Sequence, residues 1–213
     1  GYIANAVLQL TGQTSIRHVI KRISSKEDFK NAINAQTQIH EAINGTEFEG
    51  KVTEPTLVNR KRRIIVTPFV HGKTLGEELA STYDKFDLVG AVIDDYAKFF
   101  TFINHIPNRL NIPARMGRTT NIFLKYYLNS DASNTELLEL FESEIAKELD
   151  TEAKCVIHGD FHPWNILVND RFIYIDWASA VSNGLPESDI GKLLMKTDFA
   201  LETGIVDTES LTP

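Results

Sequence analysis

Residues 155–176 read Cys-Val-Ile-His-Gly-Asp-Phe-His-Pro-Trp-Asn-Ile-Leu-Val-Asn-Asp-Arg-Phe-Ile-Tyr-Ile-Asp, and they carry the strongest structural signal in the sequence. It contains two apolar runs, at 165–168 and 172–175, and the polar residues 169–171 between them are typical of a tight turn. The pattern therefore predicts a loop, a strand, a turn and a second strand in succession, so that the two outer ends of the hairpin lie side by side.

Three oxygen-bearing side chains stand around this predicted hairpin. Asn165 opens the first strand, Asp176 closes the second, and Asp160 lies in the loop that leads into them. Phosphoryl transfer uses one carboxylate to orient and deprotonate the attacking hydroxyl, and an amide oxygen with a second carboxylate to hold Mg²⁺ against nucleotide phosphates. The spacing therefore predicts Asp160 as the catalytic residue and Asn165 and Asp176 as the metal ligands.

The string His-Gly-Asp-Phe-His-Pro-Trp-Asn-Ile-Leu-Val at 158–168 resembles the aminoglycoside phosphotransferase and choline kinase-like family, and so do Ile-Asp-Trp at 175–177 and Asp-Ile-Gly at 189–191. The resemblance implies an α+β, protein-kinase-like fold of two lobes. The small N-terminal lobe would hold an antiparallel sheet and one helix, and the mainly helical C-terminal lobe would carry the catalytic loop and the β-hairpin. It also implies ATP or GTP as phosphoryl donor, Mg²⁺ as cofactor, and a hydroxyl of a small molecule, an antibiotic or a metabolite, as acceptor.

The same resemblance assigns supporting roles around the catalytic loop and the phosphates. His158 would brace the loop, and Asp189 would fasten its backbone as a buried structural carboxylate. Lys21 is at the position of the family's phosphate-contacting lysine. Glu41 is the best-spaced helix carboxylate to pair with that lysine, and Glu27 is a weaker alternative.

Two further segments resemble the family's nucleotide-binding elements. Residues 1–5, Gly-Tyr-Ile-Ala-Asn, resemble the trailing half of the loop that covers the phosphates, and Asn5 is the binding residue expected there. Residues 68–72, Pro-Phe-Val-His-Gly, have the composition of a connector between two lobes. In the family this connector offers backbone groups to the nucleotide base, which makes Val70 the expected partner.

Hydrophobic periodicity places the elements of the small lobe. Helical spacing predicts a helix over 26–43, started by Ser24 or Ser25. Alternating apolar residues predict strands at 4–10, 16–23, 51–53, 56–58 and 64–67. We therefore expect a nucleotide-binding lobe at 1–70 and a catalytic, acceptor-binding lobe at 71–213. Relative to the family, the first strand and the last helices are missing, so the fold is expected to be truncated at both ends.

The C-terminal lobe is predicted to open with a helix over 84–106, which Pro107 ends. Further helices are predicted at 119–128 and 134–149. The first of the three helices has apolar residues at steps of three and four, which predicts a core-facing stripe. Its members are Phe86, Val89, Ile93, Ala97, Phe100 and Ile103.

Composition limits the classes of partner. The chain has 213 residues and a net charge of −7, which argues against nucleic acid, and the basic run at 60–63 is interpreted as a solvated turn. No apolar run approaches the ~20 residues of a membrane helix, so no membrane partner is expected. The single cysteine, Cys155, excludes an intramolecular disulfide framework and favours a cytoplasmic location. The oligomeric state is left open.

The sequence leaves three other interpretations open. His158, Asp160 and His162 would suit a zinc site, although zinc would leave the asparagine and the second aspartate of the hairpin without a role. A nucleotide-binding pseudokinase or regulatory module would normally lack one of the catalytic side chains, and all are present. A protein kinase would need a long activation segment, whereas only the 12 residues 177–188 separate Asp176 from Asp189.

Overall fold

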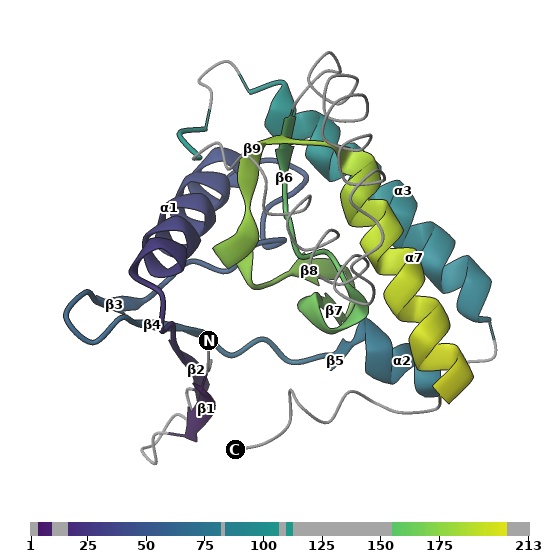
Figure 1. Cartoon of the computed structure of the whole chain (residues 1–213), viewed down its shortest axis with the longest axis horizontal. Helices are drawn as coiled ribbons and strands as arrows, with labels where there is room; N and C mark the ends of the chain where they lie inside the picture. Colours follow the sequence, from purple (N-terminus) through teal and green to yellow (C-terminus); the bar gives the residue numbers. More distant parts are fainter. Residues whose placement is uncertain (1–3, 10–16, 82–83, 107–109, 113–154, 204–213) are drawn as a thin grey trace, which may run out of the picture.

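The computed structural model describes residues 4–9, 17–81, 84–106, 110–112 and 155–203, and in them the chain is an α+β fold of small antiparallel sheets and helices (Figure 1). The helices predicted at 119–128 and 134–149 lie outside these residues. None of the helices in the described ranges is long and apolar enough to span a bilayer.

The N-terminal sheet has the strand order β1-β2-β4-β3, and its neighbouring strands are all antiparallel. Its members are β1 (Ala4–Gln9), β2 (Arg17–Arg22), β3 (Leu57–Asn59) and β4 (Ile64–Pro68). The hairpin predicted from 4–10 and 16–23 and the strand predicted at 64–67 are confirmed. The strand predicted at 51–53 is wrong, because the chain bends here: the N–H of Lys51 bonds to the carbonyl of Phe48 three residues earlier, at 3.1 Å, and to no neighbouring strand among the described residues.

Helix α1 (Lys26–Ile43) confirms the helix predicted from periodicity. Ser25 caps its start, since the serine hydroxyl oxygen accepts a hydrogen bond of 3.1 Å from the backbone N–H of Asp28. The buried Asn31 donates through Nδ2 to the carbonyls of Ala178 and Ala180, at 2.9 and 2.8 Å. The helix is thereby anchored to the segment that follows the predicted metal-binding hairpin.

The predicted hairpin is present as β7 (Ile166–Val168) and β8 (Phe172–Tyr174), with Ile166 opposite Tyr174. A short strand that the sequence did not predict, β5 (Lys73–Thr74), pairs with the free edge of β7. It follows the connector at 69–72 and runs directly into α2 (Leu75–Ser81), which was not predicted either. The connector therefore leads from the N-terminal sheet to the catalytic hairpin.

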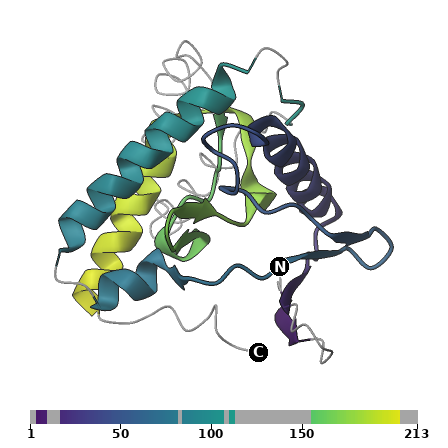
Figure 2. The ribbon, with the colours of Figure 1, turned by 180° about the vertical axis from the view of Figure 1, so that it is seen from behind.

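Two more strands lie directly before and after residues 158–180, which contain the loop and the hairpin and are called the catalytic segment below. β6 (Cys155–Ile157) pairs antiparallel with β9 (Val181–Gly184), and α7 (Pro186–Thr203) follows at once. Figures 1 and 2 show α1 on one flank of the molecule and α3 (Lys85–Asn104) with α7 on the other, with the hairpin between them. The hairpin therefore lies between the two helical flanks.

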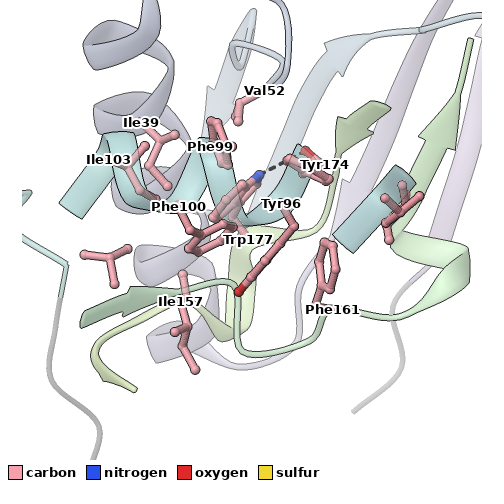
Figure 3. Packing of buried hydrophobic residues seen from close by; sticks show 14 of the residues in the cluster. Ile39, Val52, Tyr96, Phe99, Phe100, Ile103, Ile157, Phe161, Tyr174 and Trp177 are labelled. Atoms are coloured by element: carbon pink, nitrogen blue, oxygen red, sulfur yellow. Dashed lines mark hydrogen bonds between the residues drawn. The ribbon is translucent and has the colours of Figure 1, made fainter. Parts of the chain in front are cut away.

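The larger hydrophobic core contains an aromatic cluster from α3 and the catalytic segment (Figure 3). Ring centroids lie 4.1 Å apart for Tyr96 and Phe161 and 5.2 Å apart for Phe99 and Tyr174. Val52, on the other side of the connector, belongs to the same core. The core thus crosses the lobe boundary that the sequence placed at residue 70.

The buried stripe of α3 is turned relative to the one predicted. Val89, Phe100 and Ile103 are buried as expected, but Phe86 is 87% exposed and Ala97 is exposed. Aromatic packing with the catalytic segment selects the neighbouring face of the helix. Its buried members are Val89, Val92, Tyr96, Phe99, Phe100 and Ile103.

Candidate active site

The loop between β6 and β7 starts at a fully buried histidine. His158 Nε2 donates to the carbonyl of Ile175, with 2.8 Å between the two atoms, and its Nδ1 accepts from the backbone N–H of Asp160 at 3.3 Å. Burial lowers the pKa of His158, although the charges of Asp189 and Asp160 oppose the change, so the ring is a neutral brace. Because both ring nitrogens are occupied, His158 is unavailable to zinc, which contradicts the zinc interpretation.

Asp189, at the start of α7, is buried against the same loop. Its Oδ2 accepts from the backbone N–H of His158 at 2.8 Å and from the hydroxyl of Tyr96 at 2.6 Å, and its Oδ1 accepts from the N–H of Gly159 at 3.0 Å. Gly159 has a φ of 76°, and a Cβ built there would lie 2.1 Å from the Ser179 carbonyl oxygen. The loop backbone is therefore fixed by a carboxylate and requires glycine at this position.

Asp160 is the half-exposed carboxylate of the loop. Its Oδ1 lies 3.1 Å from the ammonium of Lys192, and its Oδ2 lies 3.6 Å from His162 Nε2. Partial burial opposes ionisation, but the neighbouring His162 ring and the charge of Lys192 outweigh it and hold the pKa of Asp160 well below its usual range. The carboxylate is ionised at neutral pH.

Asn165 ends the 3₁₀ turn η2 (Pro163–Asn165) and turns its amide toward the loop. Its Nδ2 donates to the backbone carbonyl of Asp160 at 2.9 Å, and its own backbone carbonyl accepts from the N–H of Ile175 at 3.0 Å. No described residue donates to its Oδ1, so this oxygen is the free end of a firmly held amide.

Asp176 follows β8, next to the residue that binds Asn165. Its φ and ψ of 65° and 63° are left-handed, a conformation that aspartate tolerates better than most residues but that still costs about 1 kcal/mol or more. One carboxylate oxygen, Oδ2, forms an ion pair with the ammonium of Lys21 on β2. The catalytic loop, the hairpin and the N-terminal sheet therefore meet at this aspartate.

The free oxygens of this cluster suit magnesium. Asn165 offers an amide oxygen, and Asp176 offers a carboxylate whose Oδ1 pairs with none of the residues that the structure describes. Hard oxygen donors of this kind are what Mg²⁺ prefers. The backbone of Asn165 bonds to the N–H of Ile175, the residue directly before Asp176, so both residues lie at the same end of the hairpin.

The structure does not bring Glu41 to Lys21. Glu41 is exposed, lies between the buried Ile39 and Ile43, and pairs with no described residue. Residues two positions apart on a helix point to nearly opposite faces, so the burial of its neighbours turns Glu41 to solvent. The described ion pair of Lys21 is instead with Asp176, which is the correction to the expected Lys21–Glu41 pair.

The other two nucleotide-binding candidates are Asn5, which lies next to Lys21 in the sheet, and Val70, which lies in the connector. The backbone of Asn5 in β1 is opposite Lys21 in the strand register. Val70, in the connector, is partly buried, and its backbone groups bond to none of the described residues.

Trp177, directly after Asp176, is buried in the core. Its Nε1 donates to the carbonyl of Tyr174 at 3.0 Å (Figure 3). Its ring centroid lies 4.6 Å from that of His158. Trp177 therefore supports the hairpin from the core side and does not line an open surface.

The sequence did not single out Lys192. It lies three residues after Asp189 on α7, a spacing that puts both side chains on one helix face. That spacing was the available signal, because the face that carries the buried Asp189 must contact the loop.

A profile of the phosphotransferase enzyme family matches residues 4–208. The chain belongs to this family. The resemblance to aminoglycoside phosphotransferases is thereby confirmed, and the chain is a phosphotransferase that acts on a hydroxyl group of a small molecule. No curated protein sequence matches it significantly.

Solved structures of similar fold include APH(2")-IIia in complex with GDP and kanamycin. That chain is 20% identical, with a TM-score of 0.61, and the match covers 97% of the present chain and 80% of the other. The macrolide 2'-phosphotransferase MphH from Brachybacterium faecium is 13% identical, with a TM-score of 0.47 and coverage of 94% and 71%. The α+β, kinase-like fold predicted from the sequence is confirmed.

Proposed function

We propose that this phosphotransferase transfers the γ-phosphoryl group of ATP or GTP to a hydroxyl of a small antibiotic or metabolite. The observation that carries the proposal is the convergence of loop, hairpin and sheet. The backbone carbonyl of Asp160 holds the Asn165 amide, the backbone of Asn165 binds Ile175, and the next residue, Asp176, pairs with Lys21. A carboxylate beside an amide oxygen, a second carboxylate and an ammonium is the set that this chemistry requires.

In this proposal Asn165 and Asp176 hold Mg²⁺ through the side-chain oxygens that bond to no residue in the described part of the chain. The bound ion would offset the charge of the phosphates. Lys21, already beside Asp176, would contact the same phosphates, and the backbone near Asn5, opposite Lys21 in the sheet, would cover them. Val70 would offer backbone groups to the base.

Asp160 would act on the acceptor. The acceptor oxygen forms a bond to the γ-phosphorus while the bond from that phosphorus to the leaving diphosphate oxygen breaks, and the hydroxyl proton passes to Asp160. A carboxylate whose pKa is held low is a weak base, so orientation of the hydroxyl contributes more than proton removal.

A small acceptor is favoured over a peptide by the way residues 177–188 are used. They form the turn η3 (Trp177–Ser179), the strand β9 that pairs with β6, and the first residues of α7. This segment is fully occupied in building the loop support, and none of it projects as a platform for a peptide.

The experiment is a measurement of nucleotide consumption with Mg²⁺, with ATP and GTP tested separately against a panel of alcohols, amino sugars and antibiotics. GTP is included because APH(2")-IIia was solved with GDP. We expect acceptor-dependent turnover with at least one pair, identified as a phosphorylated product by mass spectrometry.

Two variants give this screen its controls. Asp160→Asn should lower kcat by about 10²–10⁴-fold with little change in nucleotide affinity. Asp170→Asn makes the same change on the exposed turn of the hairpin and should leave kcat as it is. Nucleotide binding without turnover on any acceptor would favour a pseudokinase, and turnover on peptides alone would favour a protein kinase.

A further inference from the structure

Helix α7 holds the catalytic loop by two side chains of opposite charge. The carboxylate of Asp189 accepts hydrogen bonds from the backbone N–H groups of His158 and Gly159. Three residues on, Lys192 donates from its ammonium to the carbonyl of Gly159, at 2.9 Å, and to Oδ1 of Asp160, at 3.1 Å. The first contact set fixes the backbone, and only the second reaches the carboxylate.

The contacts of the Asp160 carboxylate are unequal. Oδ1 has a charge-assisted hydrogen bond to Lys192 at 3.1 Å. Among the described residues, Oδ2 has only long contacts, 3.4 Å to the amide of Asn165 and 3.6 Å to His162. One oxygen is therefore anchored, and the other is left with accepting capacity.

We propose that Lys192 is a positioning residue for Asp160: it anchors Oδ1 and the neighbouring carbonyl so that Oδ2 faces the acceptor hydroxyl. The inference rests on the proposed function and adds a residue to it. Lys192 itself touches neither the acceptor nor the nucleotide in this role.

A stabilising surface ion pair is the competing explanation. The side chains of Lys192 and Asp160 are 30% and 36% exposed, and pairs at such exposure contribute little to stability. Misplacement of a reacting group, in contrast, lowers the rate steeply. A positioning role therefore predicts a large loss of kcat with almost unchanged thermal stability and nucleotide KM.

The test is Lys192→Cys, followed by alkylation with 2-bromoethylamine. The cysteine sulfur displaces bromide and gains an aminoethyl group, which restores an ammonium at nearly the length of lysine. The chain has one other cysteine, Cys155, which is partly buried and whose pKa burial raises to about 11, so the new thiol reacts first. Mass spectrometry verifies single alkylation.

We expect Lys192→Cys to lower kcat about 10- to 100-fold, with the nucleotide KM and the melting temperature close to those of the wild type. Alkylation should return most of the lost kcat. Lys196→Cys, one turn further along α7 and without a contact to Asp160 or Gly159, is the matched control and should lose nothing before or after alkylation. Wild-type protein treated with the reagent controls for reaction at Cys155.

Each other outcome overturns the proposal. A kcat within about twofold of wild type means that Lys192 does not position Asp160. A fall in kcat that alkylation does not reverse, or that comes with an equal loss of stability, means that the lysine is structural. If the wild type itself turns over no acceptor, the proposed function fails and this inference falls with it, whereas an active wild type with an unaffected variant overturns this inference alone.

Discussion

Two lysine–aspartate pairs flank the same hairpin, and they differ in how fully their groups are used. Lys51 donates to both oxygens of Asp95, at 2.7 and 2.6 Å, lies over the ring of Tyr174, and shares Asp95 with the hydroxyl of that tyrosine. Lys21 contacts a single oxygen of Asp176. The two aspartates are almost equally exposed, 26% and 24%, so burial does not separate them.

The two pairs differ in how many hydrogen-bonding and charged partners each aspartate has. A charge removed from water needs several partners to offset its lost hydration, and Asp95 has them within the protein. Asp176 has one partner and a left-handed backbone that places its second oxygen where no described residue reaches it. The pair of Lys51 and Asp95 therefore stabilises the fold, whereas the pair of Lys21 and Asp176 leaves one carboxylate oxygen available to a ligand.

The largest effect expected from this contrast is on turnover. Asp176→Ala should lower Mg²⁺-dependent turnover by at least about 10³-fold, because it removes the charged metal ligand. The measurement is kcat at saturating nucleotide and acceptor over a Mg²⁺ titration.

Backbone strain needs its own control at this position. Alanine tolerates the left-handed conformation less well than asparagine does, so Asp176→Asn separates strain from loss of charge. We expect the asparagine variant to melt like the wild type and still to lose most turnover. Unchanged turnover in either variant would defeat the metal assignment.

The pair of Lys51 and Asp95 should respond in the opposite way, with a loss of stability and an unchanged kcat. Asp95→Ala leaves the ammonium of Lys51 buried without its counter-ion, which should cost about 3 kcal/mol and lower the melting temperature by roughly 10 °C. Molecules that remain folded at low temperature should keep their kcat.

A double replacement sharpens this second expectation. Lys51→Met with Asp95→Leu removes both charges and should recover part of the lost stability, since apolar replacements of buried pairs are often tolerated. Recovery should be incomplete, because the hydroxyl of Tyr174 loses its acceptor. A double variant less stable than Asp95→Ala would show that the pair is not the unit that matters.

The smallest effect is expected at Glu41. Glu41→Gln should change kcat/KM by no more than about twofold, because the side chain is exposed and pairs with no described residue. Glu47→Gln, on an exposed residue beyond the helix, is the matched control. A tenfold loss confined to Glu41→Gln would restore its assignment as the partner of Lys21.

Local signals in the sequence were enough for the elements with a clear pattern. The hairpin at 165–175 has two apolar runs around a polar turn, and α1 has both helical spacing and a serine cap, so each was predicted within a residue or two. β5 and α2 were missed, because a two-residue strand has no period and its existence depends on the edge of β7.

The other errors concern how a residue packs against distant parts of the chain. Lys51 was placed on a strand, Phe86 in the core and Glu41 beside Lys21, and each assignment would have needed knowledge of the packed neighbour. Lys192 was missed for the same reason, since its contact with Asp160 spans 32 positions and exists only once α7 is docked. Chain-local patterns report spacing well and orientation poorly.

The anchoring of α1 restricts how this enzyme can be regulated. Asn31 ties the helix to two carbonyls just beyond Asp176, so an outward swing would leave an amide and both acceptors without partners in the interior. An inactive state built on displacement of this helix is therefore costly.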